Sequence, residues 1–196
     1  MERYDIINKL INKYNYKTYL EIGTQHGISF TKIDIPHKVC VDPVRHFDQL
    51  TYEMTSDEFF ARNTDTFDII FVDGLHTEEQ CTVDIDNSLK ILSEGGTIVV
   101  HDCLPHCEEY VQICWNGTVY RSIIDLRYNN PDLSIVIVDT DHGCGIIRVG
   151  KQELYNKVSI ESAKTYDYFS KNKTDLMNVI SVEDFIQRVE STEYHS

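Results

Sequence analysis

The chain of 196 residues is 41% hydrophobic and carries 18 basic against 32 acidic residues, for a net charge of −14. This length favours a single domain with one sizeable core, and the negative charge repels phosphate backbones, which argues against nucleic-acid binding. No apolar run approaches the roughly 20 residues that span a bilayer, and the start, MERYDIINKL, lacks the apolar core of a signal peptide, so we expect a cytoplasmic protein.

The hydrophobic pattern alternates between helical and strand periods along the first hundred residues. Residues 3–14 carry an apolar helical stripe, and KTYLEIG (17–23) then indicates a buried strand that stops at Gly23. Four further strands are expected at 38–42, 48–54, 66–74 and 95–102, and helices at 28–33, 56–62 and 77–92. Ser56 is the expected N-cap of the helix 56–62.

The second half of the chain predicts a helix at 118–127 and then two adjacent strands, 133–140 and 144–150, joined by the turn DHG. Strands separated by helices favour a parallel sheet with right-handed crossovers, whereas the last close pair favours an antiparallel hairpin. Residues 151–196 are polar and are expected to be mostly helical, with amphipathic turns at 174–180 and 181–189.

Together these elements predict an α/β fold. We expect a Rossmann-like, seven-stranded, mostly parallel sheet with an antiparallel hairpin at one edge and helices on both faces. The domain is placed at residues 1–150, and residues 151–196 are interpreted as a helical extension that packs on it or mediates self-association into a homo-oligomer.

In an open sheet of this kind the ligand binds at the carboxyl ends of the strands, near the point where the strand order reverses. Four loops then come into question, and each carries an acid or a histidine just past an apolar strand: residues 23–27, 42–43, 73–77 and 101–105.

Four segments around these loops carry a family resemblance: YLEIGTQHGIS (19–29), VCVDP (39–43), FDIIFVDGLHTEEQ (67–80) and LSEGGTIVVHDCLP (92–105). They resemble class I S-adenosylmethionine-dependent methyltransferases. More narrowly, they resemble small-molecule and sugar O-methyltransferases whose fourth strand ends in D-G-x-H and whose fifth ends in H-D. Residues 115–127 and 138–150 are similar to the later part of that pattern, so the resemblance spans residues 17–150 and says little about the tail.

The resemblance implies a cofactor site for S-adenosylmethionine. The glycines of EIGTQHG let the backbone approach a ligand closely, although a plain strand–helix turn explains them equally well. Asp42 can accept hydrogen bonds from two ribose hydroxyls, or it is a solvated acid at a strand end. By resemblance Glu21 holds the amino end of the methionine moiety and Ser56 and Asp57 contact adenine. The full expected set is Glu21, Gly23, Thr24, Gly27, Asp42, Ser56, Asp57 and Asp73.

The candidate catalytic and metal-binding residues are Asp73, His76, His101 and Asp102. Asp73, His101 and Asp102 could hold a divalent cation, Mg or Mn, because carboxylate oxygens suit both and an imidazole shifts the preference towards Mn. In the alternative, Asp73 faces the sulfonium charge and His76 caps the following helix. Related metal-dependent O-methyltransferases have two acids after the fifth strand, where this chain has His101–Asp102, so the metal stays open.

Methyl transfer needs in-line alignment and removal of the acceptor's proton. His76 and His101 are the candidate bases, because an imidazole titrates near neutrality and an adjacent acid such as Asp73 can fix its tautomer. His106 is a weaker candidate.

The acceptor site has its own candidates. Tyr110, Trp115 and Tyr120 either line it or belong to the core, and for Trp115 we expect the core. Residues 104–117 are the expected lid over this site.

The sequence therefore predicts transfer of a methyl group from S-adenosylmethionine to an oxygen of a small acceptor. The resemblance implies that this acceptor is a sugar or a sugar nucleotide. Two alternatives stay open. One is a metal-dependent hydrolase that uses Asp73, His76, His101 and Asp102, and the other is a nucleoside-binding module without catalysis.

Overall fold

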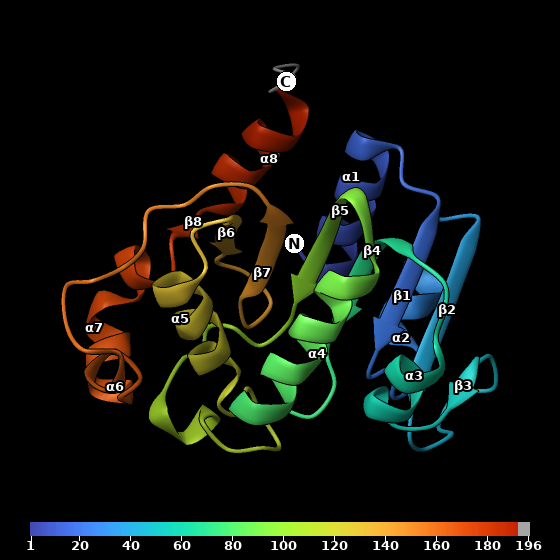
Figure 1. Ribbon diagram of the computed structural model, residues 1–196, viewed down its shortest axis with the longest axis horizontal. Coiled ribbons are helices and arrows are strands. Elements are labelled where there is room, and N and C mark those ends of the chain that lie inside the picture. Colours follow the sequence, from blue (N-terminus) through green and yellow to red (C-terminus); the bar gives the residue numbers. More distant parts are fainter. Residues whose placement is uncertain (192–196) are drawn as a thin grey trace.

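The computed structural model describes residues 1–191. Its strands form one sheet in the order β3-β2-β1-β4-β5-β7-β6-β8 (Figure 1). The strands are β1 (Thr18–Ile22), β2 (His37–Asp42), β3 (Tyr52–Glu53), β4 (Phe67–Val72), β5 (Leu92–Val100), β6 (Leu133–Val138), β7 (Cys144–Val149) and β8 (Val179–Ile180). All neighbours pair in parallel except β7, which runs antiparallel to both β5 and β6.

Helices cover both faces of this sheet, as predicted (Figure 1). They are α1 (Arg3–Tyr14), α2 (Ile28–Lys32), α3 (Ser56–Arg62), α4 (Glu78–Ile91), α5 (Val119–Asn129), α6 (Ile160–Ala163), α7 (Tyr166–Leu176) and α8 (Val182–Glu190), with a short 3-10 turn η1 (Glu108–Tyr110). No helix within residues 1–191 is both long enough and apolar enough to cross a membrane.

The buried side chains form two layers because successive strand residues point to opposite faces. In β4, Ile70 and Val72 belong to the layer shared with α3, α4, α5 and α7, whereas Ile69 and Phe71 belong to the layer shared with α1, α2 and α8. The central strands are thus buried on both faces, which is why they read as continuous apolar runs rather than alternating ones.

The strand order reverses between β1 and β4. From β1 the chain proceeds outward through β2 to β3, and it then returns to pair β4 with the other side of β1. The connections that leave β1 and β4 therefore diverge at their carboxyl ends and open a crevice between them. The ends of β2 and β5 flank this crevice, so the four predicted loops lie along one edge of the sheet.

The predicted sheet was wrong in strand number and in the place of the hairpin. The sheet has eight strands rather than seven, because Val179 and Ile180 pair in parallel with Ile137 and Val138 of β6. The hairpin β6–β7 exists, but β8 rather than β6 forms the edge. The helical prediction for residues 174–180 fails at the same place, since α7 ends at Leu176.

The N-cap of α3 was also predicted wrongly. Thr55, not Ser56, caps this helix: its hydroxyl accepts from the backbone N–H of Glu58, and the Glu58 carboxylate accepts from the backbone N–H of Thr55. This reciprocal pair is a capping box. Ser56 is the first residue of the helix, and its side chain is free to take part in other contacts.

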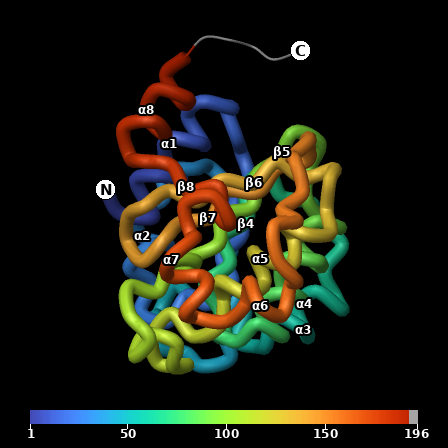
Figure 2. The backbone as a smooth tube through the Cα atoms, turned by 90° about the vertical axis from the view of Figure 1, so that its left-hand side faces the viewer, coloured from blue at the N-terminus to red at the C-terminus, as the bar shows by residue number. Residues whose placement is uncertain are grey.

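The segment after Gly150 packs against both layers. Phe169 and Leu176 of α7 join one buried cluster, and Phe185 of α8 joins the other. Figure 2 shows α8 beside α1, where Lys13 Nζ donates to the carbonyl oxygens of Arg188 and Val189 at the end of α8. Residues 192–196 of the predicted extension lie outside the described residues.

Candidate functional site

A cavity of about 820 Å³ opens at the carboxyl ends of β1, β2, β4 and β5. Residues from all four predicted loops contribute to it, including every residue proposed for the cofactor except Gly27. Its size falls within the range of roughly 300–1,000 Å³ that is usual for small-molecule sites. Five carboxyl side chains line it, and Arg3 is the one lysine or arginine among the described lining residues.

Glu21 stands at the end of β1 and is 1% exposed. Its carboxylate accepts a hydrogen bond from the Tyr19 hydroxyl. Burial raises the pKa of Glu21 to about 8, because the Tyr19 hydrogen bond only partly offsets the cost of taking a charge out of water. A cationic group bound beside Glu21 would favour the ionised carboxylate and reverse this shift.

Gly23 permits two loops to touch. Its φ is +83°, and a Cβ atom there would lie 2.0 Å from the carbonyl oxygen of Asp73. Only glycine fits such a contact at a positive φ. The close backbone approach expected at this glycine is therefore made to the loop after β4, and it joins the end of β1 to the acid at the end of β4.

Asp42 ends β2 and holds the neighbouring loops in place. Its Oδ2 accepts from the backbone N–H of Gln25 at 2.8 Å, and its Oδ1 accepts from the backbone N–H of Val44 at 2.9 Å. Each carboxylate oxygen has a second lone pair. Asp42 can therefore still accept hydrogen bonds from a ligand in the cavity.

The end of the cavity beside α3 is lined by Thr55, Ser56 and Asp57, together with Gln80 from α4. Gln80 was not among the site residues predicted from the sequence. Its side-chain amide connects Ser56 and Asp57 to the buried Asp84, also on α4. The helical spacing of Gln80 and Asp84 was readable from the sequence, but their proximity to the loop after β3 was not.

Asp73, His76 and Asp102 converge at the opposite end. His76 Nε2 lies 3.5 Å from Asp73 Oδ1 and 3.3 Å from Asp102 Oδ2, and its Nδ1 contacts the carbonyl oxygen of Trp115. Burial opposes the charged imidazole, but Asp73, Asp102 and the carbonyl outweigh it and raise the pKa of His76. Because a carbonyl only accepts, Nδ1 carries a proton and Nε2 is the nitrogen that titrates.

His101 is enclosed by three carboxylates. Its Nδ1 lies 3.2 Å from both Asp73 and Asp102, and its Nε2 lies 3.5 Å from Asp141. Although burial disfavours the imidazolium, these acids raise the pKa of His101 well above its usual value. Burial likewise opposes the charge on Asp73, but His101 and His76 hold the pKa of Asp73 below its usual range.

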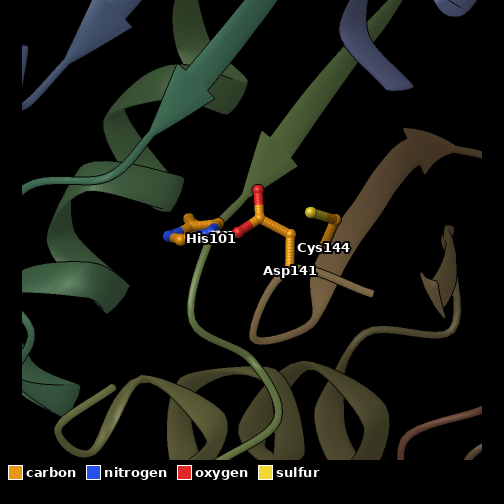
Figure 3. Close-up of side chains that lie close together, drawn as sticks. All are labelled: His101, Asp141 and Cys144. Carbon is orange, nitrogen blue, oxygen red and sulfur yellow. Dashed lines mark ion pairs between the residues drawn. The ribbon is translucent and has the colours of Figure 1, made fainter. Parts of the chain in front are cut away.

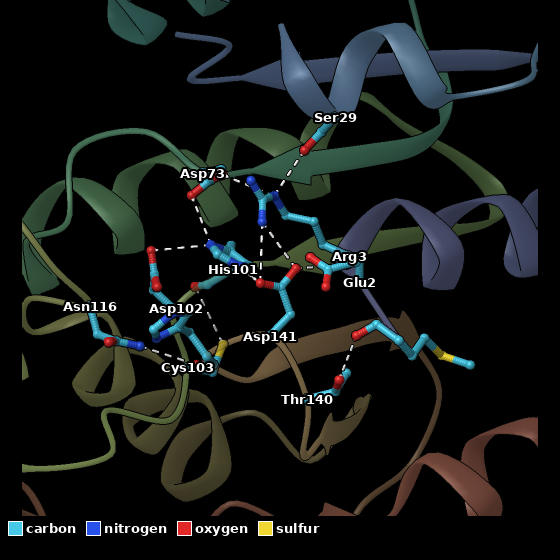
Figure 4. Close-up of polar contacts among 12 residues, drawn as sticks. Glu2, Arg3, Ser29, Asp73, His101, Asp102, Cys103, Asn116, Thr140 and Asp141 are labelled. Carbon is cyan, nitrogen blue, oxygen red and sulfur yellow. Dashed lines mark hydrogen bonds and ion pairs between the residues drawn. The ribbon is translucent and has the colours of Figure 1, made fainter. Parts of the chain in front are cut away.

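Arg3 and Asp141, which the sequence did not single out, complete this network (Figure 4). Arg3 Nη1 donates to both Asp141 oxygens, at 3.2 and 3.0 Å, and Nε donates to Ser29 Oγ at 2.8 Å. The guanidinium also lies 3.9 Å from Asp73. Burial opposes ionisation of Asp141, yet His101 and Arg3 hold its pKa below the usual range. The start of α1 thus supplies a cation to the end of β4 and to the turn between β6 and β7.

A second cluster beside this network has donors of the types that metals use, namely His101, Asp141 and Cys144 (Figure 3). One ligand atom from each lies within 4.8 Å of the others. The cluster is poorly suited to a cation, because the Arg3 guanidinium already pairs with Asp141.

The predicted lid segment borders the cavity through Ile113 and Cys114. Trp115 was expected in the core, but its side chain is 49% exposed and stacks on Tyr110 with the ring centroids 4.7 Å apart. Tyr120 is fully buried in the core instead. His106 is exposed and lies outside the lining of the cavity.

Comparisons with known proteins agree with this fold. Residues 37–103, from β2 to the loop after β5, match a family model described as a methyltransferase domain. No curated protein matches the chain.

Three similar solved structures are enzymes or cofactor complexes of this fold. Cofactor-bound Rv0187 from MTB is 15% identical over 75% of this chain and 79% of that chain, with a TM-score of 0.59. An O-methyltransferase from Bacillus cereus in complex with SAH is 15% identical over 74% of this chain and 79% of that chain, with a TM-score of 0.57. The third structure is the O-methyltransferase TomG from Streptomyces achromogenes, which is involved in tomaymycin synthesis, in complex with SAM. It is 17% identical over 74% of this chain and 76% of that chain, with a TM-score of 0.55. These similarities confirm a Rossmann-like methyltransferase fold.

Proposed function

We propose that the protein is an S-adenosylmethionine-dependent O-methyltransferase. The observation that carries this proposal is one cavity in which Glu21, Asp42 and Asp57 lie along the strand ends that lead to Asp73, His76 and Asp102. Acids at successive positions suit a ligand that presents an amino group, a ribose and an amino-bearing base, with a positively charged sulfur at one end. The match of residues 37–103 to a methyltransferase domain supports the same activity.

In the proposed cofactor complex, Glu21 pairs with the amino group of the methionine moiety, and Asp42 accepts from the ribose hydroxyls. The loop Gly23–Gly27, with Thr24, borders the methionine end. Thr24 Oγ1 is buried and has no hydrogen-bond partner among residues 1–191, so it is available to this ligand. Ser56 and Asp57 lie beside the adenine, and Asp73 faces the sulfonium.

His76 is the proposed proton acceptor. Its Nδ1 is held by the Trp115 carbonyl, which leaves Nε2 directed at the cluster where the acceptor oxygen must approach the methyl group. A sulfonium bound beside Asp73 disfavours the imidazolium and so helps His76 to lose its proton before the acceptor binds. His101 is less suited to this role, because both of its nitrogens face carboxylates; it instead keeps Asp73 and Asp102 in place.

The same end of the cavity also fits a divalent cation. Asp73, His76 and Asp102 offer two carboxylates and one imidazole within 4.8 Å of one another. His76 has the second hydrogen bond, from Nδ1 to a backbone carbonyl, that orients metal-binding histidines. The metal ligands predicted from the sequence were Asp73, His101 and Asp102. In the set proposed here, His76 replaces His101. A bound Mg or Mn would orient the acceptor hydroxyl and increase its acidity.

We further propose a sugar-derived acceptor that enters between Leu75 and Ile113. Both side chains line the cavity, and they are 54% and 58% exposed. Trp115 lies two residues after Ile113 and presents an exposed aromatic ring of the kind that packs on the apolar face of a sugar. With Arg3 already bound to Asp141, the cavity offers little positive charge to a pyrophosphate, so a sugar is favoured over a sugar nucleotide.

Calorimetry with S-adenosylhomocysteine tests the cofactor assignment. We expect micromolar binding by the wild type and a loss of at least about tenfold in Asp42→Ala, because that carboxylate would accept two hydrogen bonds. Glu53→Ala, an exposed acid on β3 outside the cavity, is the matched control. Absence of S-adenosylhomocysteine binding would reject the transferase, and tight metal binding together with that absence would favour the hydrolase. A panel of simple glycosides with labelled S-adenosylmethionine then tests the acceptor.

A further inference from the structure

The side-chain amide of Gln80 is held by three oxygen acceptors. Its Nε2 donates to Asp84 Oδ1 at 3.1 Å, and to Ser56 Oγ and Asp57 Oδ1 at 3.2 Å each. The Asp57 carboxylate accepts hydrogen bonds and does not donate them, so the nitrogen of the Gln80 amide faces this group. The other terminal atom, Oε1, consequently points away from it.

Asp84 fixes this orientation from behind the cavity. It stands one helical turn after Gln80 on α4, is 1% exposed and is not among the residues that line the cavity. A buried carboxyl is costly unless its hydrogen bonds are made. Burial raises the pKa of Asp84, and the hydrogen bond from the Gln80 amide partly offsets this cost. The same hydrogen bond holds the amide nitrogen of Gln80 towards Asp84.

The resulting surface presents acceptor atoms to the cavity. Gln80 Oε1 and Asp57 Oδ2 accept no hydrogen bond from any residue between 1 and 191. Both side chains line the cavity beside α3. A ligand edge that carries a hydrogen-bond donor would therefore be bound there, and an edge that carries only acceptors would leave these oxygens unpaired.

We propose that Gln80, oriented by Asp84, selects adenine by accepting a hydrogen bond from its exocyclic amino group. This inference rests on the proposed function, which places the cofactor in this cavity. Adenine carries an amino donor at position 6, whereas a 6-oxo purine carries an acceptor oxygen there. Gln80 is thus a specificity-determining residue, and Asp84 acts through it as a positioning residue.

The test compares the dissociation constants of S-adenosylhomocysteine and S-inosylhomocysteine, which differ at this position of the base. The wild type is expected to prefer the adenine compound by roughly tenfold or more, because a site built for a hydrogen-bond donor rejects an analogue without it. The ratio of the two constants is the readout, since a general loss of folding or of cavity shape weakens both compounds together.

Three variants test which side chains cause the preference for the adenine compound. Gln80→Met keeps the length of the side chain and is expected to bring the ratio to within about twofold of one. Asp84→Asn exchanges an acceptor for an N–H donor, which allows the Gln80 amide to turn over, and is expected to give an intermediate ratio. Glu79→Ala, on the exposed side of α4, is expected to keep the wild-type ratio.

The outcomes separate the two proposals. Equal binding of both compounds by the wild type, or an unchanged ratio in Gln80→Met, would overturn the role of Gln80 while leaving the cofactor assignment intact. Binding of neither compound would overturn the cofactor assignment and this inference with it. A ratio that falls in Gln80→Met but not in Asp84→Asn would remove Asp84 alone.

Discussion

His76 directs Nε2 at the carboxylate of Asp102, 3.3 Å away, and this pair lies at the end of the cavity where the acceptor must approach. Replacement of His76 by alanine or glutamine is expected to lower the rate of methyl transfer by about 10²- to 10⁴-fold, because the proton acceptor is lost. His106→Ala, on the exposed side of the loop after β5, should keep nearly full activity. The measurement is kcat/KM with labelled cofactor.

The dependence of kcat/KM on pH also tests the role of His76 as the proton acceptor. Carboxylates raise the pKa of His76 above its usual value, so kcat/KM should rise with pH through a midpoint above 6.5. His76→Gln should abolish the rise. Activity should survive chelation with EDTA; loss of activity that Mn or Mg restores would instead make His76 a metal ligand.

Glu21 predicts proton release when S-adenosylhomocysteine binds. At pH 7 its carboxyl, with a pKa of about 8, is largely protonated, and a bound amino cation should ionise it and release up to one proton. Affinity should therefore increase with pH and level off above about 8. S-adenosylhomocysteine lacks the sulfonium, so His76 contributes little to this signal.

Calorimetry in buffers of different ionisation enthalpy measures the number of protons released. Glu21→Gln should release almost none at pH 7, and the wild type should release almost none at pH 9. Equal release by the wild type and Glu21→Gln at pH 7 would assign the proton to another group.

Arg3 and Asp141 predict an energetic coupling between the start of α1 and the turn between β6 and β7. Arg3→Met leaves a partly buried carboxylate without its cation and should lower the free energy of unfolding by about 1–3 kcal/mol. Arg3→Met/Asp141→Asn should recover part of this loss, with an interaction energy of about 1–2 kcal/mol. Urea unfolding of the four proteins at pH 7 measures it.

The direction in which this stability contribution changes with pH follows from the pKa of Asp141. Its folded pKa lies below the ordinary value of 3.8, so its contribution is fully present above about 3.8 and is lost as the pH falls through the lower value. The stability difference between wild type and Arg3→Met should therefore shrink in acid. Additive single variants at pH 7 would show that the two side chains do not stabilise each other.

We propose that residues 151–191 belong to the same folding unit as the sheet rather than to a separate extension. Phe185 of α8 is 2% exposed, and its replacement by alanine should cost about 3–5 kcal/mol in a single cooperative transition. Gln187→Ala, on the exposed face of α8, should change stability by less than about 0.5 kcal/mol. Two separate thermal transitions in the wild type would contradict a single unit.

The sequence predicted the central sheet and the four loops because their signals are local. Buried strands such as 67–72 and the polar residues that follow them are adjacent in the chain, so Asp73 and His76 could be placed together. Arg3 and Asp141 could not, since they are far apart in sequence and Asp141 reads as part of an ordinary turn. Gln80 was missed for a similar reason, because its partners Ser56 and Asp57 come from another loop.

Other errors have smaller physical causes. Val179 and Ile180 continue an amphipathic pattern, and two residues are too few to show a strand period, so β8 was missed. Thr55 and Glu58 form a readable capping box, and the choice of Ser56 overlooked it. Trp115 was assigned to the core, although its side chain in the loop is 49% exposed.

The two outermost strands each consist of only two residues, Tyr52–Glu53 in β3 and Val179–Ile180 in β8. A long exposed edge offers unpaired backbone groups to a neighbouring molecule, and such short edges offer few. Two copies of this chain therefore have little basis for joining their sheets through β3 or β8. These two short strands protect the ends of the sheet at which they lie against strand-mediated aggregation.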